Sequence, residues 1–119
     1  MSVERYLMIL KTARVHEDDR VWFGRWFRRY AVFLEQSETS TLAVSLDSVK
    51  QFCRKLLGRQ VPAWQRQQAV RAIECYRSEV LLSAEPDLLE IRQVLARLAE
   101  RERMSLSAAS NWNNSGLRN

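Results

Sequence analysis

Glycine, proline, cysteine and histidine are all scarce in this chain of 119 residues, and each shortage excludes a class of site. Three glycines cannot build the glycine-rich loop that holds a nucleotide phosphate. One histidine and two cysteines, the latter in different predicted helices, are too few for a structural zinc site, which needs several convergent ligands. We therefore expect no metal site, no cofactor and no catalytic residue, and we expect that the chain is not an enzyme.

The sequence also has no long hydrophobic run. No apolar segment approaches the roughly 20 residues that a membrane-spanning helix needs. The first residues, Met1 to Tyr6, lack the basic stretch and apolar core of a secretory signal. We expect a cytoplasmic protein with no membrane partner. Because the cytoplasm keeps thiols reduced, Cys53 and Cys75 are expected to be free.

Positive charge is present in excess. Lysine and arginine total 19 against 14 aspartate and glutamate residues, so the net charge is +5 and the pI is near 9.8. Most of the basic residues are arginine, whose planar guanidinium group can bond two phosphate oxygens at once. Such a charge balance is typical of nucleic-acid-binding domains, but it also occurs in basic proteins that bind no nucleic acid.

Hydrophobic periodicity predicts helices and no strands. Apolar side chains recur at helical spacing, with no stretch of strand-like alternation. The predicted helices cover residues 3–14, 19–36, 46–57, 62–82 and 87–104. Residues 105–119 are rich in serine and asparagine and are predicted to form a flexible tail or linker. We expect one all-α domain over residues 1–104, a four- to five-helix orthogonal bundle.

The segment 19–36 contains most of the aromatic residues. They follow the i, i+4, i+8 spacing of one helix face, which predicts that this face packs into the core. The stripe consists of Trp22, Phe23, Trp26, Phe27, Tyr30, Phe33 and Leu34.

Basic and amide side chains occupy the opposite faces of two predicted helices, 19–36 and 62–82, when residues are placed about 100° apart. Arginine suits phosphate oxygens and glutamine suits base edges, so these residues are candidate DNA contacts. The pattern fits an ordinary solvated surface equally well. The candidates are Arg25, Arg28, Arg29, Arg66, Gln67, Gln68 and Arg71.

The helix predicted over 46–57 carries a further basic pair. Lys50 and Arg54 are one turn apart, and like charges at this spacing mildly destabilise an isolated helix. A compensating interaction elsewhere would offset this cost.

Three segments resemble the N-terminal core-binding domain of tyrosine recombinases, especially phage and integron integrases. The segment from Val61 to Leu81 resembles the last major helix of that SAM-like domain, with matches at Gln68-Ala69, Ala72, Tyr76 and Val80-Leu81. Two further segments resemble the second and third helices of that domain. The match to the second helix consists of Trp26-Phe27-Arg28-Arg29-Tyr30 with Phe33-Leu34, and the match to the third consists of Leu46-Asp47-Ser48-Val49 with Phe52 and Leu56. The resemblance covers about residues 3–82. One departure is Pro62-Ala63-Trp64, where the family often has serine or threonine.

The resemblance implies a non-catalytic domain that clamps double-stranded DNA at a recombination site. In such enzymes a separate C-terminal domain supplies the tyrosine nucleophile and its basic partners. The DNA-facing helices of the family would correspond to 19–36 and 62–82, the two that carry the candidate arginines. Self-association in a recombination complex would then involve the helix predicted over 87–104.

Two hypotheses follow from the sequence. In the first, the chain is a DNA-binding domain of an integrase-like tyrosine recombinase, with arginines on phosphates and Gln67 or Gln68 on a base. In the alternative, it is a helical protein-interaction module whose 87–104 helix docks into a partner groove, and its basic surface is only solvated.

Overall fold

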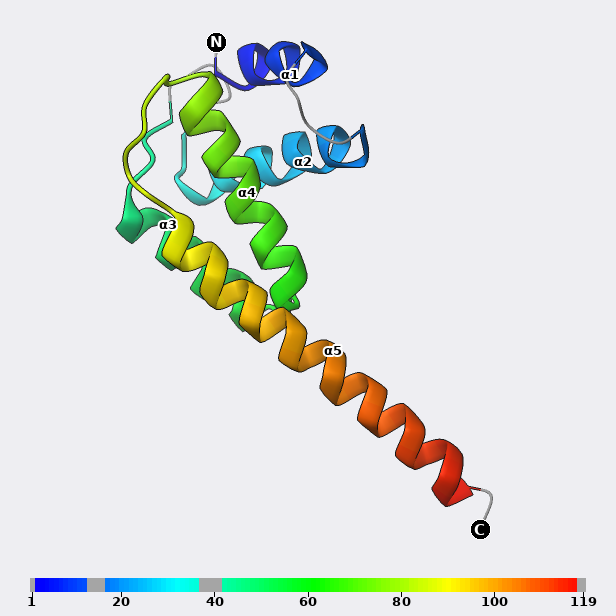
Figure 1. Ribbon diagram of the computed structural model, residues 1–119. Helices are drawn as coiled ribbons and strands as arrows, with labels where there is room; N and C mark the ends of the chain where they lie inside the picture. The colour runs from blue at the N-terminus through cyan, green and yellow to red at the C-terminus, as the bar shows by residue number, and fades with distance from the viewer. Residues whose placement is uncertain (1, 13–16, 37–41, 118–119) are drawn as a thin grey trace.

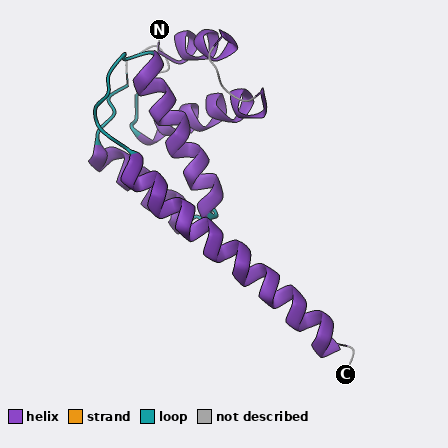
Figure 2. Cartoon of the chain, viewed as in Figure 1, coloured by secondary structure: helices purple, strands orange, loops and turns teal. Residues whose placement is uncertain are grey.

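Helices account for all the regular structure in the described part of the chain, and no strand occurs there (Figure 2). The computed structural model describes the backbone of residues 2–12, 17–36 and 42–117, and the side chains of residues 5–11, 17–36 and 42–105. The helices are α1 (Ser2–Thr12), α2 (Glu17–Phe33), α3 (Leu46–Gly58), α4 (Ala63–Glu79) and α5 (Leu89–Leu117). The predicted all-α bundle is confirmed.

Helix α4 lies at the centre of the bundle and contacts each of the other helices. The C-terminal half of α4 lies beside α1, and its N-terminal end is crossed by α5, which then continues away from the bundle (Figure 1). This central position leaves α4 less exposed surface than α2 or α3. Only a few side chains of α4 can therefore face a partner.

Aromatic rings from three helices form the centre of the core. Phe27 of α2 stacks on Tyr76 of α4 with ring centroids 4.2 Å apart, and Tyr6 of α1 meets the Phe27 ring edge-on at 4.8 Å. All three side chains are fully buried. The Tyr6 hydroxyl donates to the Ala72 carbonyl, and the Tyr76 hydroxyl accepts a hydrogen bond from the Leu42 amide. Burial of these rings supplies hydrophobic stabilisation. Because both hydroxyls form hydrogen bonds, the fold avoids the free-energy cost of burying an unpaired polar group.

The predicted aromatic stripe of α2 is buried along its middle and exposed at one edge. Phe23, Trp26, Phe27 and Tyr30 are buried, and Phe33 and Leu34 are half-buried. Trp22 is 45% exposed, so its prediction as a core residue is wrong. The stripe is wider than the surface that α4 and α1 cover.

The two ends of helix α4 are set in different ways, one by the local backbone and the other by a residue distant in the sequence. Helix α4 ends at Glu79, before the predicted end at residue 82, and Leu82 has a left-handed φ of 52° that cannot continue a helix. At the other end Pro62 makes no side-chain cap, and the Glu102 carboxylate of α5 accepts the Ala63 amide at 2.9 Å. Tertiary packing therefore supplies a cap that the local sequence lacks.

Helix α5 does not end at residue 104 as predicted. It continues to Leu117, so most of the segment predicted as a tail or linker is helical, and residues 118–119 lie outside the described part. Extending an existing helix requires no new nucleus. Serine and asparagine can therefore follow the packed turns of α5 in spite of their weak helix propensity.

Burial raises the pKa of several weak acids in the core. It raises the pKa of the Tyr6 and Tyr30 hydroxyls and of the Cys75 thiol, and it raises the pKa of Cys53 to about 11. Both cysteines are free, as predicted. A group whose pKa is higher in the folded state than in the unfolded state stabilises the fold below its unfolded pKa, and that contribution is lost as the pH rises.

We therefore predict that the protein loses stability in alkaline solution. The loss should begin above about pH 8.5, the ordinary value for a thiol, and should grow toward pH 11 as the tyrosines also ionise. Urea unfolding at a series of pH values measures it, and Cys53→Ala should reduce the loss between pH 9 and 11. A urea midpoint that is constant across this range would contradict the prediction.

Candidate nucleic-acid interface

A basic groove lies between α2 and α3. Four cationic side chains line it, two from α2 and two from the C-terminal end of α3, and they surround an apolar floor. Among the described residues, no carboxylate lines this groove. The cations are Arg28, Arg29, Lys55 and Arg59, and the floor consists of Val32, Phe33, Phe52 and Leu56.

The cations from α3 are held by the end of that helix and by the floor. The Lys55 ammonium lies 5.5 Å from the centre of the Phe33 ring, which itself packs on Phe52 at 5.3 Å. Arg59 is the C-cap residue of α3, and its amide bonds to the Leu56 carbonyl at 3.1 Å. The negative end of the helix dipole favours both cations there and offsets part of their mutual repulsion.

Two arginines of α2 are positioned by indole rings one turn away. The Arg29 guanidinium lies 4.6 Å above the ring of Trp26, and the Arg25 guanidinium lies 5.0 Å above the ring of Trp22. Stacking uses the face of a guanidinium and leaves its N–H groups able to bond phosphate oxygens. It also restricts the side chain before binding, which lowers the entropic cost of forming a contact.

One predicted contact residue, Arg66, is not on the surface. Its side chain is buried, its Nε donates to the Val61 carbonyl at 3.2 Å, and its guanidinium lies 3.8 Å from the Glu102 carboxylate. The prediction that Arg66 lies on an exposed outer face is therefore wrong, and its side chain is not available there as a DNA contact. The helical projection placed it at the edge of an outer face, but α5 covers that edge.

The glutamines of α4 are also engaged with neighbouring helices. The Gln68 carbonyl oxygen accepts a hydrogen bond from the Trp26 indole at 2.9 Å. A glutamine that reads adenine needs this oxygen and the amide nitrogen together, so the bond to Trp26 conflicts with that role. Gln67 lines a different groove, toward Ala96 and Ala99 of α5. The structure thus separates two residues that were predicted to act on one face.

The remaining candidates, Arg25 and Arg71, lie near the acidic start of α2. Arg71 forms an ion pair with Asp19 at 3.1 Å, and its guanidinium stacks on Phe23 at 5.5 Å. Arg25 and Gln68 line a shallow pocket that also includes Glu17 and Asp18. Acidic neighbours repel phosphate, so this end of α2 is a poorer anion site than the α2–α3 groove.

Two residues of the basic groove were not predicted. Lys55 and Arg59 are one turn apart at the end of α3, a spacing that is visible in the sequence. Their approach to Arg28 and Arg29 is not visible there, because it depends on how α2 and α3 pack.

Neither a family model, nor a curated protein, nor a solved structure matches the chain. Within the described residues, no three His, Cys, Asp or Glu side chains gather in a way that could hold a metal ion. None of the described helices combines the length and the apolar character needed to cross a bilayer. Among the features of the described residues, the basic groove between α2 and α3 is the one that points to a binding partner.

Proposed function

We propose that this chain is a non-catalytic DNA-binding domain whose α2–α3 groove contacts the phosphates of double-stranded DNA. The observation that carries the proposal is the convergence of four cations on one groove whose described lining contains no carboxylate.

The chemistry of the groove suits a polyanion with regularly spaced charges. Duplex DNA carries one phosphate per roughly 3.4 Å of each strand, so cations on two adjacent helices can meet successive phosphates. Val32, which is 74% exposed, lies among these cations and offers an apolar contact for deoxyribose. Contacts of this kind position a protein on DNA and do not read its sequence.

The proposal retains the resemblance to integrase core-binding domains and changes one part of it. Helix α2 remains a DNA-facing helix, but its partner in the interface is α3 in place of α4. The order and spacing of the three matching helices support a clamp role within a tyrosine recombinase, with catalysis supplied by a separate domain. The four groove cations support the DNA contact itself.

The salt dependence of DNA binding tests the proposal. Each phosphate contact contributes about −0.9 to the slope of log affinity against log salt, so four cations predict a slope of roughly −3 to −4. Fluorescence anisotropy with a short labelled duplex, between about 50 and 200 mM salt, measures this slope. A slope near zero, or no binding at the lowest salt, would refute the proposal and favour a protein-interaction module.

A further inference from the structure

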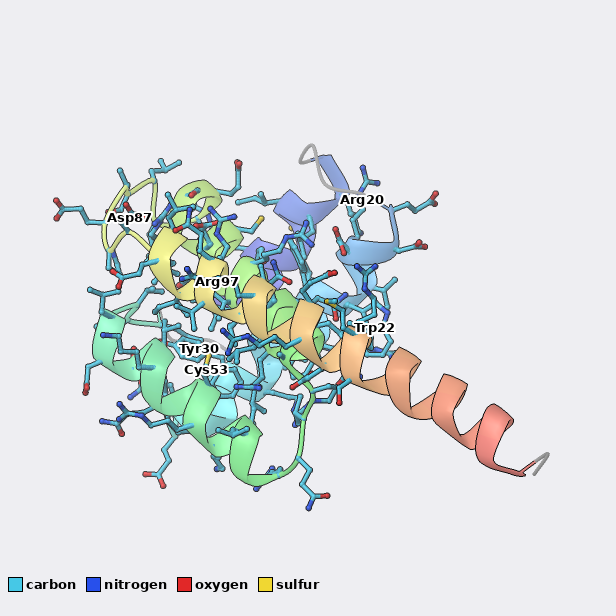
Figure 3. The ribbon with its side chains drawn as sticks, turned by 60° about the horizontal axis from the view of Figure 1, so that its bottom comes forward. Arg20, Trp22, Tyr30, Cys53, Asp87 and Arg97 are labelled. Carbon is cyan, nitrogen blue, oxygen red and sulfur yellow. The ribbon has the colours of Figure 1, made fainter. Side chains whose placement is uncertain are left out.

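A second groove lies on the other side of α3, between that helix and the first turns of α5. The two helices run side by side in the same direction (Figures 1 and 3). The buried side chains of Cys53 and Leu95 lie at its base, together with the buried Arg66. Leu46 of α3 and Ile91, Val94 and Leu98 of α5 complete an apolar lining.

Part of this lining is open to solvent. Leu46 and Val94 are each 42% exposed, and Ile91 and Leu98 are half-buried. On α5 the residues 91, 94 and 98 have the spacing with which a helix packs against another helix. Helix α5 therefore packs on α4 along one edge of its apolar stripe, and the other edge of the stripe lines this groove.

The charges at the rims are separated by side. Lys50 and Arg54 are exposed along the α3 rim, and neither forms an ion pair within the described part of the chain. Asp87 and Glu90 are exposed at the opposite rim, at the start of α5. Lys50 and Arg54 are one turn apart and repel each other, a cost that acidic groups of a partner would remove. A ligand with acids on one flank and bases on the other would complement both rims.

We propose that the α3–α5 groove binds an amphipathic α-helix of a partner protein, with acidic residues toward α3 and basic residues toward α5. A helix fits because the groove is bounded by two helices running side by side, the arrangement in which a third helix completes a bundle. A little over two turns of partner helix, roughly 12 Å, would span the rim from Leu46 to Arg54. This surface is distinct from the α2–α3 groove and does not depend on the proposed DNA contact.

Two synthetic helical peptides with the same leucine stripe test this proposal. The first has glutamate on one flank and lysine on the other, and the second has lysine on both flanks. Lys50 and Arg54 attract the glutamate flank of the first peptide and repel the corresponding lysine flank of the second. The protein should therefore bind the first peptide roughly tenfold more tightly, as measured by fluorescence anisotropy. The double variant Lys50→Glu/Arg54→Glu should reverse this preference, since both rims are then acidic.

A substitution in the apolar lining provides an independent check. Val94→Asp should weaken binding of the first peptide more than tenfold, because it places a carboxylate on the surface that the leucines contact. The matched control is Val21→Asp, at a 57% exposed position on α2 outside this groove, which should leave peptide affinity unchanged. Both variants should melt near the wild-type temperature, and Val94→Asp should leave DNA affinity within about twofold if only the α2–α3 groove contacts DNA.

Three results would overturn the helix-docking proposal. Equal affinity for the two peptides would show that the rim charges select nothing, and full binding by Val94→Asp would place the peptide elsewhere. A dimer in sedimentation that Val94→Asp dissociates would assign the groove to a second copy of this chain. None of these results would affect the salt slope for DNA, so failure here and failure of DNA binding can be distinguished.

Discussion

Replacing Trp26 with alanine is expected to lower the free energy of unfolding by about 3 to 5 kcal/mol, the range for deleting a buried aromatic side chain. Trp26 is 3% exposed, its indole N–H donates to Gln68, and its ring supports the Arg29 guanidinium. The substitution would leave a cavity between α2 and α4 and would remove a hydrogen bond that joins them. Urea unfolding monitored by circular dichroism measures the change.

Trp22 provides a matched control on the same helix. It is 45% exposed and also carries a stacked arginine, Arg25, so Trp22→Ala removes an equal ring from the surface. Its effect on stability should stay within about 1 kcal/mol, because little buried area is lost. If Trp26→Ala proved as mild as Trp22→Ala, the packing of α2 on α4 described above would be wrong.

Reversing two charges of the α2–α3 groove should reduce DNA affinity by roughly 100-fold or more at low salt, because two attractive contacts become repulsive. The double variant Lys55→Glu/Arg59→Glu serves this purpose, because both residues are exposed at the end of α3. Neither residue belongs to the DNA-contacting surface that the sequence predicted on α2 and α4. The salt slope should become shallower by about two. Anisotropy titrations with one duplex over a range of salt would measure both quantities.

The control for this double variant has the same change in net charge at a different place. Arg97→Glu and Arg101→Glu lie on exposed positions of α5, outside the α2–α3 groove (Figure 3 labels Arg97). This variant should lower affinity only slightly, through the long-range field. If it abolished binding and the α3 variant did not, α5 would be the DNA-contacting helix.

The DNA interface expected from the sequence and the one proposed from the structure differ in one helix. Arginines were expected to act from α2 and α4, but the residues of α4 are already engaged: Arg66 with Val61 and Glu102, Gln68 with Trp26, and Arg71 with Asp19. A helical projection assumes that a helix has one buried face. Helix α4 is surrounded, so nearly every face of it has a neighbour.

Local features of the chain could be predicted because they depend on neighbouring residues. Serine is a favoured N-cap residue, and the Ser45 hydroxyl at the start of α3 accepts the Ser48 amide at 3.1 Å. The aromatic spacing of α2 correctly indicated that Phe23, Trp26, Phe27 and Tyr30 are buried. Helix spacing and composition were also sufficient for the all-α class, because amphipathic periodicity depends only on residues within a few turns.

The sequence by itself determined the approximate positions of the helix starts, the all-α class and the basic character of the chain. Only the tertiary structure decided which basic residues meet: it buries Arg66 beside Glu102 of α5 and brings Lys55 and Arg59 beside Arg28 and Arg29. The physical reason is range. Helix propensity and capping act between residues close in the chain, whereas a groove is formed by side chains from two helices whose approach depends on the packing of the whole core.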